Sequence, residues 1–302
     1  LMLSFVFVAS SALVLSSVAK PELKTETNSV PEVNLNLPPV PVLGIATPFP
    51  IISGQAALAV DITSGITLYE KDPDKLLLPA STTKIVTALV AMDYYSDDVV
   101  VEVGRVKVEG QKMGLRQGEK ISAGNLLLGL LVYSANDAAE VLAQNYWGGR
   151  EAFIQAMNQK AKDLNLENSF FANPSGLDGN GDRITSTAKD LVRISMVAME
   201  IPKFADIVKT KEITVTSVDG KISHKLHNIN ELVGQVDGVL GIKTGWTENA
   251  RENLITYVIR DNHKVIIALL GSQDRFGETK ELIDWIFGNY TWEEVNPRSN
   301  LP

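Results

Sequence analysis

The chain has 302 residues, 45% of them hydrophobic and 21% charged, which is ordinary for a globular protein with one large domain or two small ones. The formal net charge of −8 at pH 7 and the lack of a basic stripe with interleaved aromatic residues argue against nucleic-acid binding. The absence of cysteine excludes disulfides, thiolate metal sites and cysteine nucleophiles, and the only imidazoles are those of His224, His227 and His263.

The N-terminal segment has the pattern of an export signal. Residues 2–19 carry no charge and are followed by Lys20, and Ser17-Val18-Ala19 fits a small-x-small cleavage site. The apolar stretch is short for a membrane span, and a buried core helix is the alternative interpretation. We expect residues 1–19 to be a signal peptide or a retained N-terminal anchor, which places the protein outside the cytoplasm.

A proline-rich stretch follows the signal. Residues 20–50 hold seven of the 13 prolines and show no periodicity, which is typical of an extended or irregular linker. We expect a single catalytic domain over residues 51–290 and a short C-terminal tail over residues 291–302.

Hydrophobic periodicity predicts strands near both ends of this domain and helices between them. The expected strands are Gln55–Asp61, Ile66–Lys71, Val99–Val108, Ile213–Val218, Lys221–His227, Gly241–Trp246, Leu254–Arg260 and Lys264–Leu270. The expected helices run from Ser81 through Met92 and over Leu126–Val132, Ala138–Tyr146, Glu151–Leu164, Thr187–Met199 and Glu278–Phe287. This order predicts one sheet built from both ends of the domain, with an inserted helical region.

The motif Ser81-Thr82-Thr83-Lys84 stands at the expected start of the first helix. A three-residue step is close to one helical turn, so Ser81 and Lys84 share a face. A helix N-terminus disfavours an ammonium ion and therefore lowers the pKa of Lys84, as a lysine general base for a serine nucleophile requires. Ser-x-x-Lys also occurs at Ser17–Lys20 and Ser186–Lys189, and a capped or solvated helix face is the alternative for each copy.

Two further motifs occur once each. Ser134-Ala135-Asn136, on an expected turn between helices, can pass a proton to a leaving amine and hold a substrate amide; a helix N-cap is the alternative. Lys243-Thr244-Gly245, on an expected strand, offers a cation, a hydroxyl for a carboxylate and a glycine that lets substrate backbone approach. An edge lysine and a bulge glycine are the alternative here.

Together, the three motifs resemble the set of penicillin-binding proteins and serine β-lactamases. From about Ala56 to Phe287 the chain is similar to the D-alanyl-D-alanine carboxypeptidases, with further family signatures at residues 113–115, 118–119, 173–178, 227–230 and 237–238. The resemblance implies an α+β fold of the β-lactamase/transpeptidase type, with an antiparallel sheet flanked by helices. It also implies a serine peptidase that removes terminal D-alanine from peptidoglycan stem peptides, binds β-lactams and uses no metal or organic cofactor.

The resemblance also implies roles for individual residues. Ser81 is the acylated nucleophile, Lys84 is its base, and Ser134 with Lys243 carries the proton to the leaving D-alanine. The N–H groups of Ser81 and Trp246 form the oxyanion hole. The other implied substrate-binding residues are Asn136, Thr244, Gly245 and, as a helper for the terminal carboxylate, Arg275.

The sequence departs from the family at two places. Ile229 stands where related enzymes often carry arginine, which weakens carboxylate binding or shifts it to Arg275. Ala250-Arg251 replaces a common Ala-Gly pair.

Two alternatives stay open at this point. A class A β-lactamase needs a Glu-x-x-Leu-Asn string between the second and third motifs, but the chain has that string only at Glu32–Asn36, and Glu167 lacks the rest of it. A non-catalytic penicillin- or wall-binding module is opposed by the intact motif residues. A membrane partner is expected only through the N-terminal segment.

Overall fold

The computed structural model describes residues 37–44, 47–179 and 183–295. The predicted signal peptide or anchor (residues 1–19) and the first part of the predicted linker lie outside the described residues.

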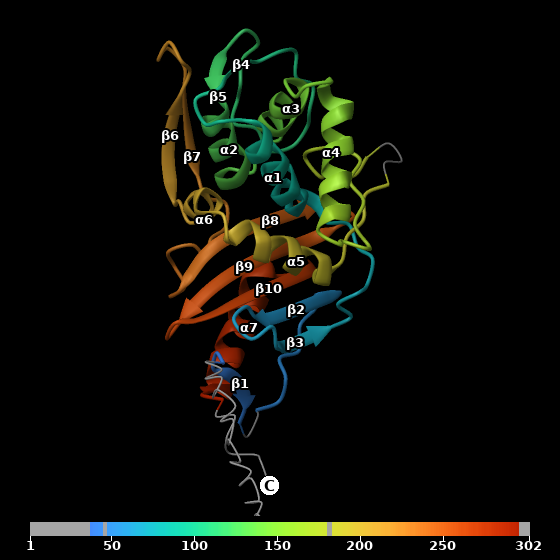
Figure 1. The fold of residues 1–302 in the computed structure, drawn as a ribbon, viewed down its shortest axis with the longest axis vertical. Coiled ribbons are helices and arrows are strands. Elements are labelled where there is room, and N and C mark those ends of the chain that lie inside the picture. The colour runs from blue at the N-terminus through green and yellow to red at the C-terminus, as the bar shows by residue number, and fades with distance from the viewer. Residues whose placement is uncertain (1–36, 45–46, 180–182, 296–302) are drawn as a thin grey trace, which may run out of the picture. The chain divides into compact units, whose positions relative to one another are not determined.

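A five-stranded antiparallel sheet forms the centre of the fold (Figure 1), with the strand order β3-β2-β10-β9-β8. The strands are β2 (Ala56–Asp61), β3 (Thr67–Lys71), β8 (Val239–Thr247), β9 (Arg251–Arg260) and β10 (His263–Ser272). The N-terminal hairpin therefore joins the C-terminal strands through the β2–β10 pair. This confirms the prediction of one sheet built from both ends of the domain, and it leaves β8 as an edge strand.

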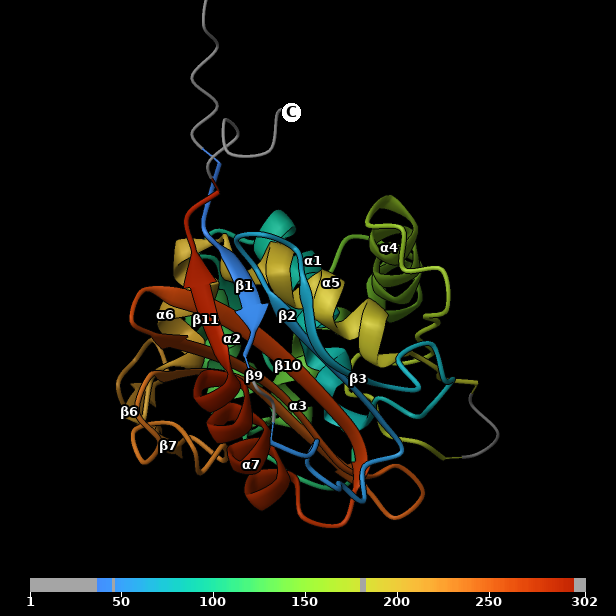
Figure 2. The same cartoon turned by 90° about the horizontal axis from the view of Figure 1, so that it is seen from below.

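Helices cover both faces of the sheet (Figure 2), and the period-two pattern of β10 shows why. Ile266, Ala268 and Leu270 belong to the core shared with the helical region, which includes α5 (Ala188–Met199). The alternate residues of β10 (Val265, Ile267 and Leu269) belong to a second core beneath α7 (Arg275–Asn289). Because β9 and β10 are buried on both faces, their sequences are continuous apolar runs.

The segment between β3 and β8 contains the inserted helical region. Its helices are η1 (Ala80–Thr83), α1 (Lys84–Tyr94), α2 (Ala123–Val132), α3 (Asn136–Gln144), α4 (Gly149–Asp163), α5 and α6 (Pro202–Val208). Two small hairpins accompany them: β4 (Val100–Glu102) with β5 (Lys120–Ser122), and β6 (Glu212–Thr216) with β7 (Ser223–His227). The mixture of helices and an antiparallel sheet confirms the predicted α+β class.

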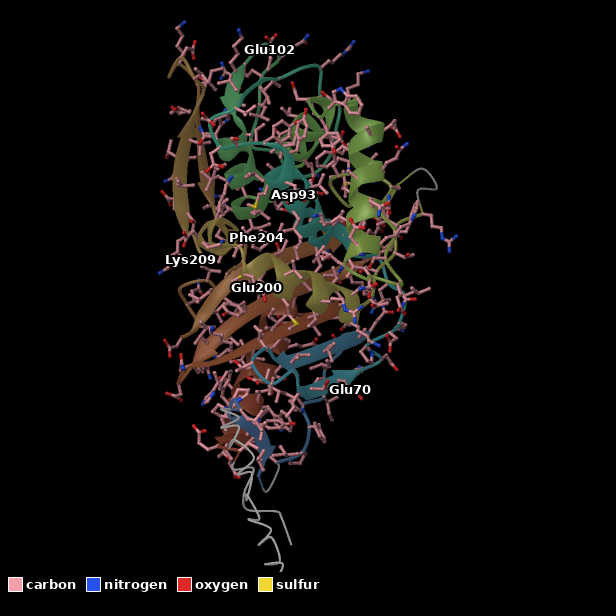
Figure 3. The ribbon with its side chains drawn as sticks, in the orientation of Figure 1. Glu70, Asp93, Glu102, Glu200, Phe204 and Lys209 are labelled. Atoms are coloured by element: carbon pink, nitrogen blue, oxygen red, sulfur yellow. The ribbon has the colours of Figure 1, made fainter. Side chains whose placement is uncertain are left out.

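Two local predictions were incomplete. Helix α6 was not predicted, because seven residues are too few to show a helical period; its Phe204 is fully buried in the core of the helical region (Figure 3). Only Val100–Glu102 of the expected strand Val99–Val108 pairs, since its partner β5 has three residues before α2 begins.

The structure also differs from the predicted linker and tail. Val40–Leu43 forms strand β1, which pairs antiparallel with β11 (Tyr290–Glu293). Trp292 stacks on His263 with 4.2 Å between ring centroids and donates from Nε1 to Asp61 at 3.1 Å. The paired strands are about 250 residues apart in the chain, and such pairing leaves no local signal in the sequence. The prediction of a linker over residues 20–50 therefore rested on proline content alone.

Candidate active site

Ser81 lies on a 3₁₀ turn rather than at the N-terminus of an α-helix. The turn η1 begins after Pro79, Thr82 Oγ1 donates to the Pro79 carbonyl at 2.7 Å, and α1 follows from Lys84. The α-helix therefore begins at Lys84, three residues later than predicted. Ser81 and Lys84 still share one face, because three residues make one full turn of a 3₁₀ helix.

Lys84 is completely buried and contacts Ser81 directly. Its Nζ donates to Ser81 Oγ at 2.7 Å and to the Ser175 carbonyl at 2.8 Å. Burial lowers the pKa of Lys84 to about 7, against a partial increase from the charges of Asp137 and Glu140. The largest cause of the low pKa is thus desolvation, which the sequence did not indicate.

The two carboxylates whose charges act on Lys84 form hydrogen bonds with other groups. Asp137 accepts the backbone N–H groups of Met113, Gly114 and Leu115 at 2.9–3.1 Å. Glu140 forms a two-point contact with Arg150, at 2.8 and 3.3 Å. In the part of the chain that the structure describes, no ion pair holds Lys84, so its amine can be neutral near pH 7.

The loop after residue 172 positions the carbonyl group that Lys84 contacts. Asn173 Oδ1 accepts the N–H groups of Ser175 and Gly176, which fixes the turn that presents the Ser175 carbonyl to Lys84. Gly176 has φ +80°, and a Cβ there would meet the carbonyl of Ala80. Glycine is therefore required where this loop meets η1.

Ser134 and Lys243 meet across the cleft. Ser134 lies in the turn between α2 and α3 with φ +60°, and its Oγ accepts from Lys243 Nζ at 2.8 Å. Lys243 Nζ also donates to the Thr244 carbonyl at 2.9 Å. The residue at the N-cap position of α3 is Ala135, so the alternative of Ser134 or Asn136 as a helix cap is wrong. Burial, and then the charges of Lys84 and Arg275, hold the pKa of Lys243 well below its usual value.

Asn136 offers one free polar atom to the cleft. Its side chain is 2% exposed, and Nδ2 donates to the Glu109 carbonyl at 2.7 Å. Its Oδ1 is buried without a hydrogen-bond partner in the described structure. The carboxamide is thus oriented by its nitrogen and presents an acceptor.

The edge strand β8 carries the third motif, and Gly245 has a role that the sequence did not reveal. A Cβ at Gly245 would lie 2.9 Å from the Pro79 carbonyl and 3.2 Å from the backbone nitrogen of Ser81. The glycine therefore lets the turn that carries Ser81 pack against β8. Trp246, the next residue, is 62% exposed at the cleft.

Arg275, the first residue of α7, reaches the same strand. Its Nη1 donates to the Gly245 carbonyl at 3.2 Å, while Nε is buried without a partner in the described structure. Its guanidinium lies over the ring of Phe276, 4.7 Å from the centroid. Ile229, the departure noted above, also lines the cleft, whereas Arg251 is exposed and does not line it.

A cleft of about 630 Å³ joins these residues. The predicted residues that line it are Ser81, Ser134, Asn136, Thr244, Gly245, Trp246 and Arg275. Lys84 and Lys243 lie buried beneath them. Sequence reasoning assigned no role to five polar loop residues that also line the cleft: Glu109, Gln111, Asp178, Glu248 and Asn249. Of these, only Asp178 lies in one of the family signatures, that at residues 173–178.

Other candidates lie outside the cleft. In the copy Ser186–Lys189, Ser186 Oγ contacts Ser169 Oγ and Lys189 pairs with Asp74 at 3.2 Å, so the two residues do not act together. Glu167 lines a separate pocket with Phe170 and Arg183.

Comparisons with known proteins identify similar enzymes. A family model described as D-alanyl-D-alanine carboxypeptidase matches residues 45–274. The chain is 33% identical to the D-alanyl-D-alanine carboxypeptidase DacB2 of Mycobacterium tuberculosis, over 85% of this chain and 88% of that protein. A mutant of a Streptomyces DD-transpeptidase superposes with a TM-score of 0.74 at 30% identity, covering 80% of this chain and all of the other. A penicillin-binding protein of Listeria monocytogenes in its ampicillin-bound form gives 0.71 at 29% identity, with coverage of 80% and 100%.

Proposed function

The chain belongs to the D-alanyl-D-alanine carboxypeptidase family, and we propose that Ser81 is the residue acylated when the enzyme removes the terminal D-alanine from peptidoglycan stem peptides. The contact between Ser81 Oγ and the buried amine of Lys84, at 2.7 Å, carries this proposal. A serine hydroxyl becomes nucleophilic when a neutral base takes its proton, and Lys84 is a base of this kind.

The first step is acylation. Lys84 Nζ accepts the hydroxyl proton while Ser81 Oγ attacks the carbonyl carbon of the penultimate D-alanine. The oxyanion that forms takes hydrogen bonds from the backbone N–H groups of Ser81 and Trp246. This pairing is supported by the packing at Gly245, which brings the Ser81 nitrogen next to β8 at the position preceding Trp246.

The second step expels the terminal D-alanine. Its nitrogen must gain a proton as the C–N bond breaks, and the Ser134 hydroxyl donates that proton. Lys243 is hydrogen bonded to Ser134 and replaces the proton that Ser134 has given up. Thr244, with Arg275 nearby, binds the terminal carboxylate of the substrate, and Asn136 holds a backbone amide. Water then attacks the acyl-enzyme, which releases the shortened peptide and restores Ser81.

Fluorescent penicillin and a synthetic peptide ending in D-Ala-D-Ala test the proposal together. The intact enzyme should form a stable covalent adduct and release D-alanine, and Ser81→Ala should do neither. Ser186→Ala, in the other Ser-x-x-Lys copy of the domain, is the matched control and should retain both. Rapid turnover of the drug in place of a stable adduct indicates a β-lactamase, and labelling that persists in Ser81→Ala contradicts the assignment of the nucleophile.

The place of action follows from the substrate. Peptidoglycan lies outside the cytoplasmic membrane, so we propose that the protein is exported and works in the periplasm, in the cell wall or at the outer face of that membrane. None of the helices in the described ranges is long and apolar enough to cross a membrane. A membrane tether through the N-terminal segment is part of the proposal, and fractionation of cells that express the full chain tests it.

A further inference from the structure

The cleft is electrically asymmetric. Arg275 lines one part of it and lies close enough to the buried Lys243 for its charge to lower the pKa of that lysine. The rim also carries three carboxylates from three loops, those of Glu109, Asp178 and Glu248.

Two contacts gather these loops into one wall. Asn249 Nδ2 donates to Asp178 Oδ2 at 2.9 Å, which joins the β8–β9 turn to the loop after residue 172. A Cβ at Gly110 would lie 3.8 Å from Leu177, so the loop that carries Glu109 adjoins Asp178. The turn with Glu248 directly follows β8, so this wall continues from the strand that bears Thr244.

The carboxylates of this wall are available for a ligand. Glu109, Asp178 and Glu248 form no ion pair with any residue that the structure describes. Nor do they converge on one point: no group of three histidine or acidic side chains in the described ranges is placed to hold a metal ion. Separate, unpaired carboxylates fit an organic cation better than a metal.

A second feature of the cleft fits a peptide ligand. Asn136 Oδ1 is a buried acceptor without a partner, and its amide nitrogen is fixed by the carbonyl of Glu109. A donor from the ligand must satisfy this oxygen, and a backbone N–H is such a donor. The carboxamide that carries this acceptor thus contacts the backbone of Glu109, one residue of the acidic wall.

The spacing along β8 indicates which substrate residue meets that wall. An extended peptide can lie antiparallel to the edge strand β8, with its terminal carboxylate at Thr244. The residue before D-Ala-D-Ala then stands about 7 Å along the strand, at roughly 3.4 Å per residue. A long amine side chain adds about 6 Å, and Glu248, four residues beyond Thr244, lies at most about 13 Å along the chain.

We propose that Glu248, with Asp178 beside it, binds a free side-chain ammonium on the residue that precedes D-Ala-D-Ala. This inference rests on the proposed carboxypeptidase function and adds a specificity for the substrate. The ammonium gains an unpaired carboxylate partner, whereas an acylated side chain of the same length does not.

A pair of peptides tests the inference. Both have the form X-D-Ala-D-Ala with an acetylated α-amine, and X is lysine with either a free or an acetylated ε-amine. The intact enzyme should show kcat/KM at least tenfold higher for the free amine, and Glu248→Gln should reduce this ratio to near one. Glu70→Gln is the matched control: Glu70 is an exposed carboxylate on β3, at the opposite edge of the sheet (Figure 3), and should leave the ratio unchanged.

A charge reversal gives a second readout. Glu248→Lys should prefer a peptide with X as glutamate over one with X as lysine. A loss of stability alone cannot reverse the preference between two substrates. Equal hydrolysis of both lysine peptides by the intact enzyme, or an unchanged ratio in Glu248→Gln, overturns the inference and leaves the carboxypeptidase function standing. Hydrolysis of neither peptide overturns the proposed function, and the inference with it.

Discussion

Lys84 Nζ lies 2.7 Å from Ser81 Oγ, and its second hydrogen bond goes to the neutral carbonyl of Ser175 rather than to a carboxylate. A lysine paired with a carboxylate would stay protonated and could not act as a base. Here the nearby acids are engaged by Arg150 and by backbone amides, so burial decides the charge of Lys84.

The first prediction concerns pH. The neutral form of Lys84 is the base, and its pKa is about 7, so the acylation rate should fall about tenfold per pH unit below pH 7 and level off above it. The rate of penicillin acylation between pH 5 and 9 measures this. A flat profile over that range contradicts the role of Lys84. Lys84→Arg should be inactive throughout, because a guanidinium stays protonated.

The second prediction concerns the proton route. Ser134→Ala removes the hydroxyl that Lys243 Nζ contacts and the relay to the leaving amine, so kcat should fall by roughly 10²–10⁴. A β-lactam keeps its leaving nitrogen tethered, so comparing D-alanine release with penicillin acylation separates the two steps. Ser169→Ala, outside the cleft, should leave both rates near those of the intact enzyme. Full D-alanine release by Ser134→Ala would rule out the relay.

The third prediction concerns the packing of η1 on β8. Gly245→Ala places a methyl group 2.9 Å from the Pro79 carbonyl and 3.2 Å from the Ser81 nitrogen, so the nucleophile must shift. A displacement of about 1 Å lowers rates by roughly 100-fold, which kcat/KM for D-alanine release measures. Gly179→Ala is the matched control, since a Cβ there meets nothing within 4 Å. Equal activity of the two variants would contradict the packing argument.

The fourth prediction concerns a buried polar pair that joins β7 to the residue before β5. His224 joins Glu119 through Nε2 at 2.7 Å and the Met113 carbonyl through Nδ1 at 3.0 Å. His224→Ala leaves both partners unsatisfied and should lower the free energy of unfolding by about 1–3 kcal/mol in urea titrations. Lys225 lies on the same strand as His224 and forms an exposed pair with Glu212 of β6, so Lys225→Ala should cost less than about 1 kcal/mol. Similar losses in the two variants would speak against the buried pair.

The fifth prediction concerns the β1–β11 ribbon. Trp292→Ala removes the stacking on His263 and the hydrogen bond to Asp61, and should lower the free energy of unfolding by about 2 kcal/mol. The ribbon is remote from the residues that line the cleft, so kcat/KM should be unchanged. Thr291→Ala, an exposed neighbour on the same strand, should change neither quantity. An unaltered stability of Trp292→Ala would mean that the ribbon does not belong to the folded domain.

Much of the fold and site was predictable because it depends on local pattern. The apolar runs of β9 and β10, and the helical periods of α4 and α5, appear within single windows of the sequence. The motifs at Ser81, Ser134 and Lys243 are likewise short strings. Helix α6 and the carboxylates of Glu109 and Glu248 have no such signature, so they became visible only in the structure.

The sequence by itself determined the α+β class, the order of the elements and the residue types that carry the chemistry. Only the tertiary structure brought the motifs into contact, because the hydrogen bonds of Lys84 with Ser175 and of Ser134 with Lys243 join residues 91 and 109 positions apart. The same holds for the pKa of Lys84, since burial and neighbouring charges depend on what distant segments bring to the amine. The acidic wall of the cleft also arises from three separate loops, and no local pattern contains it.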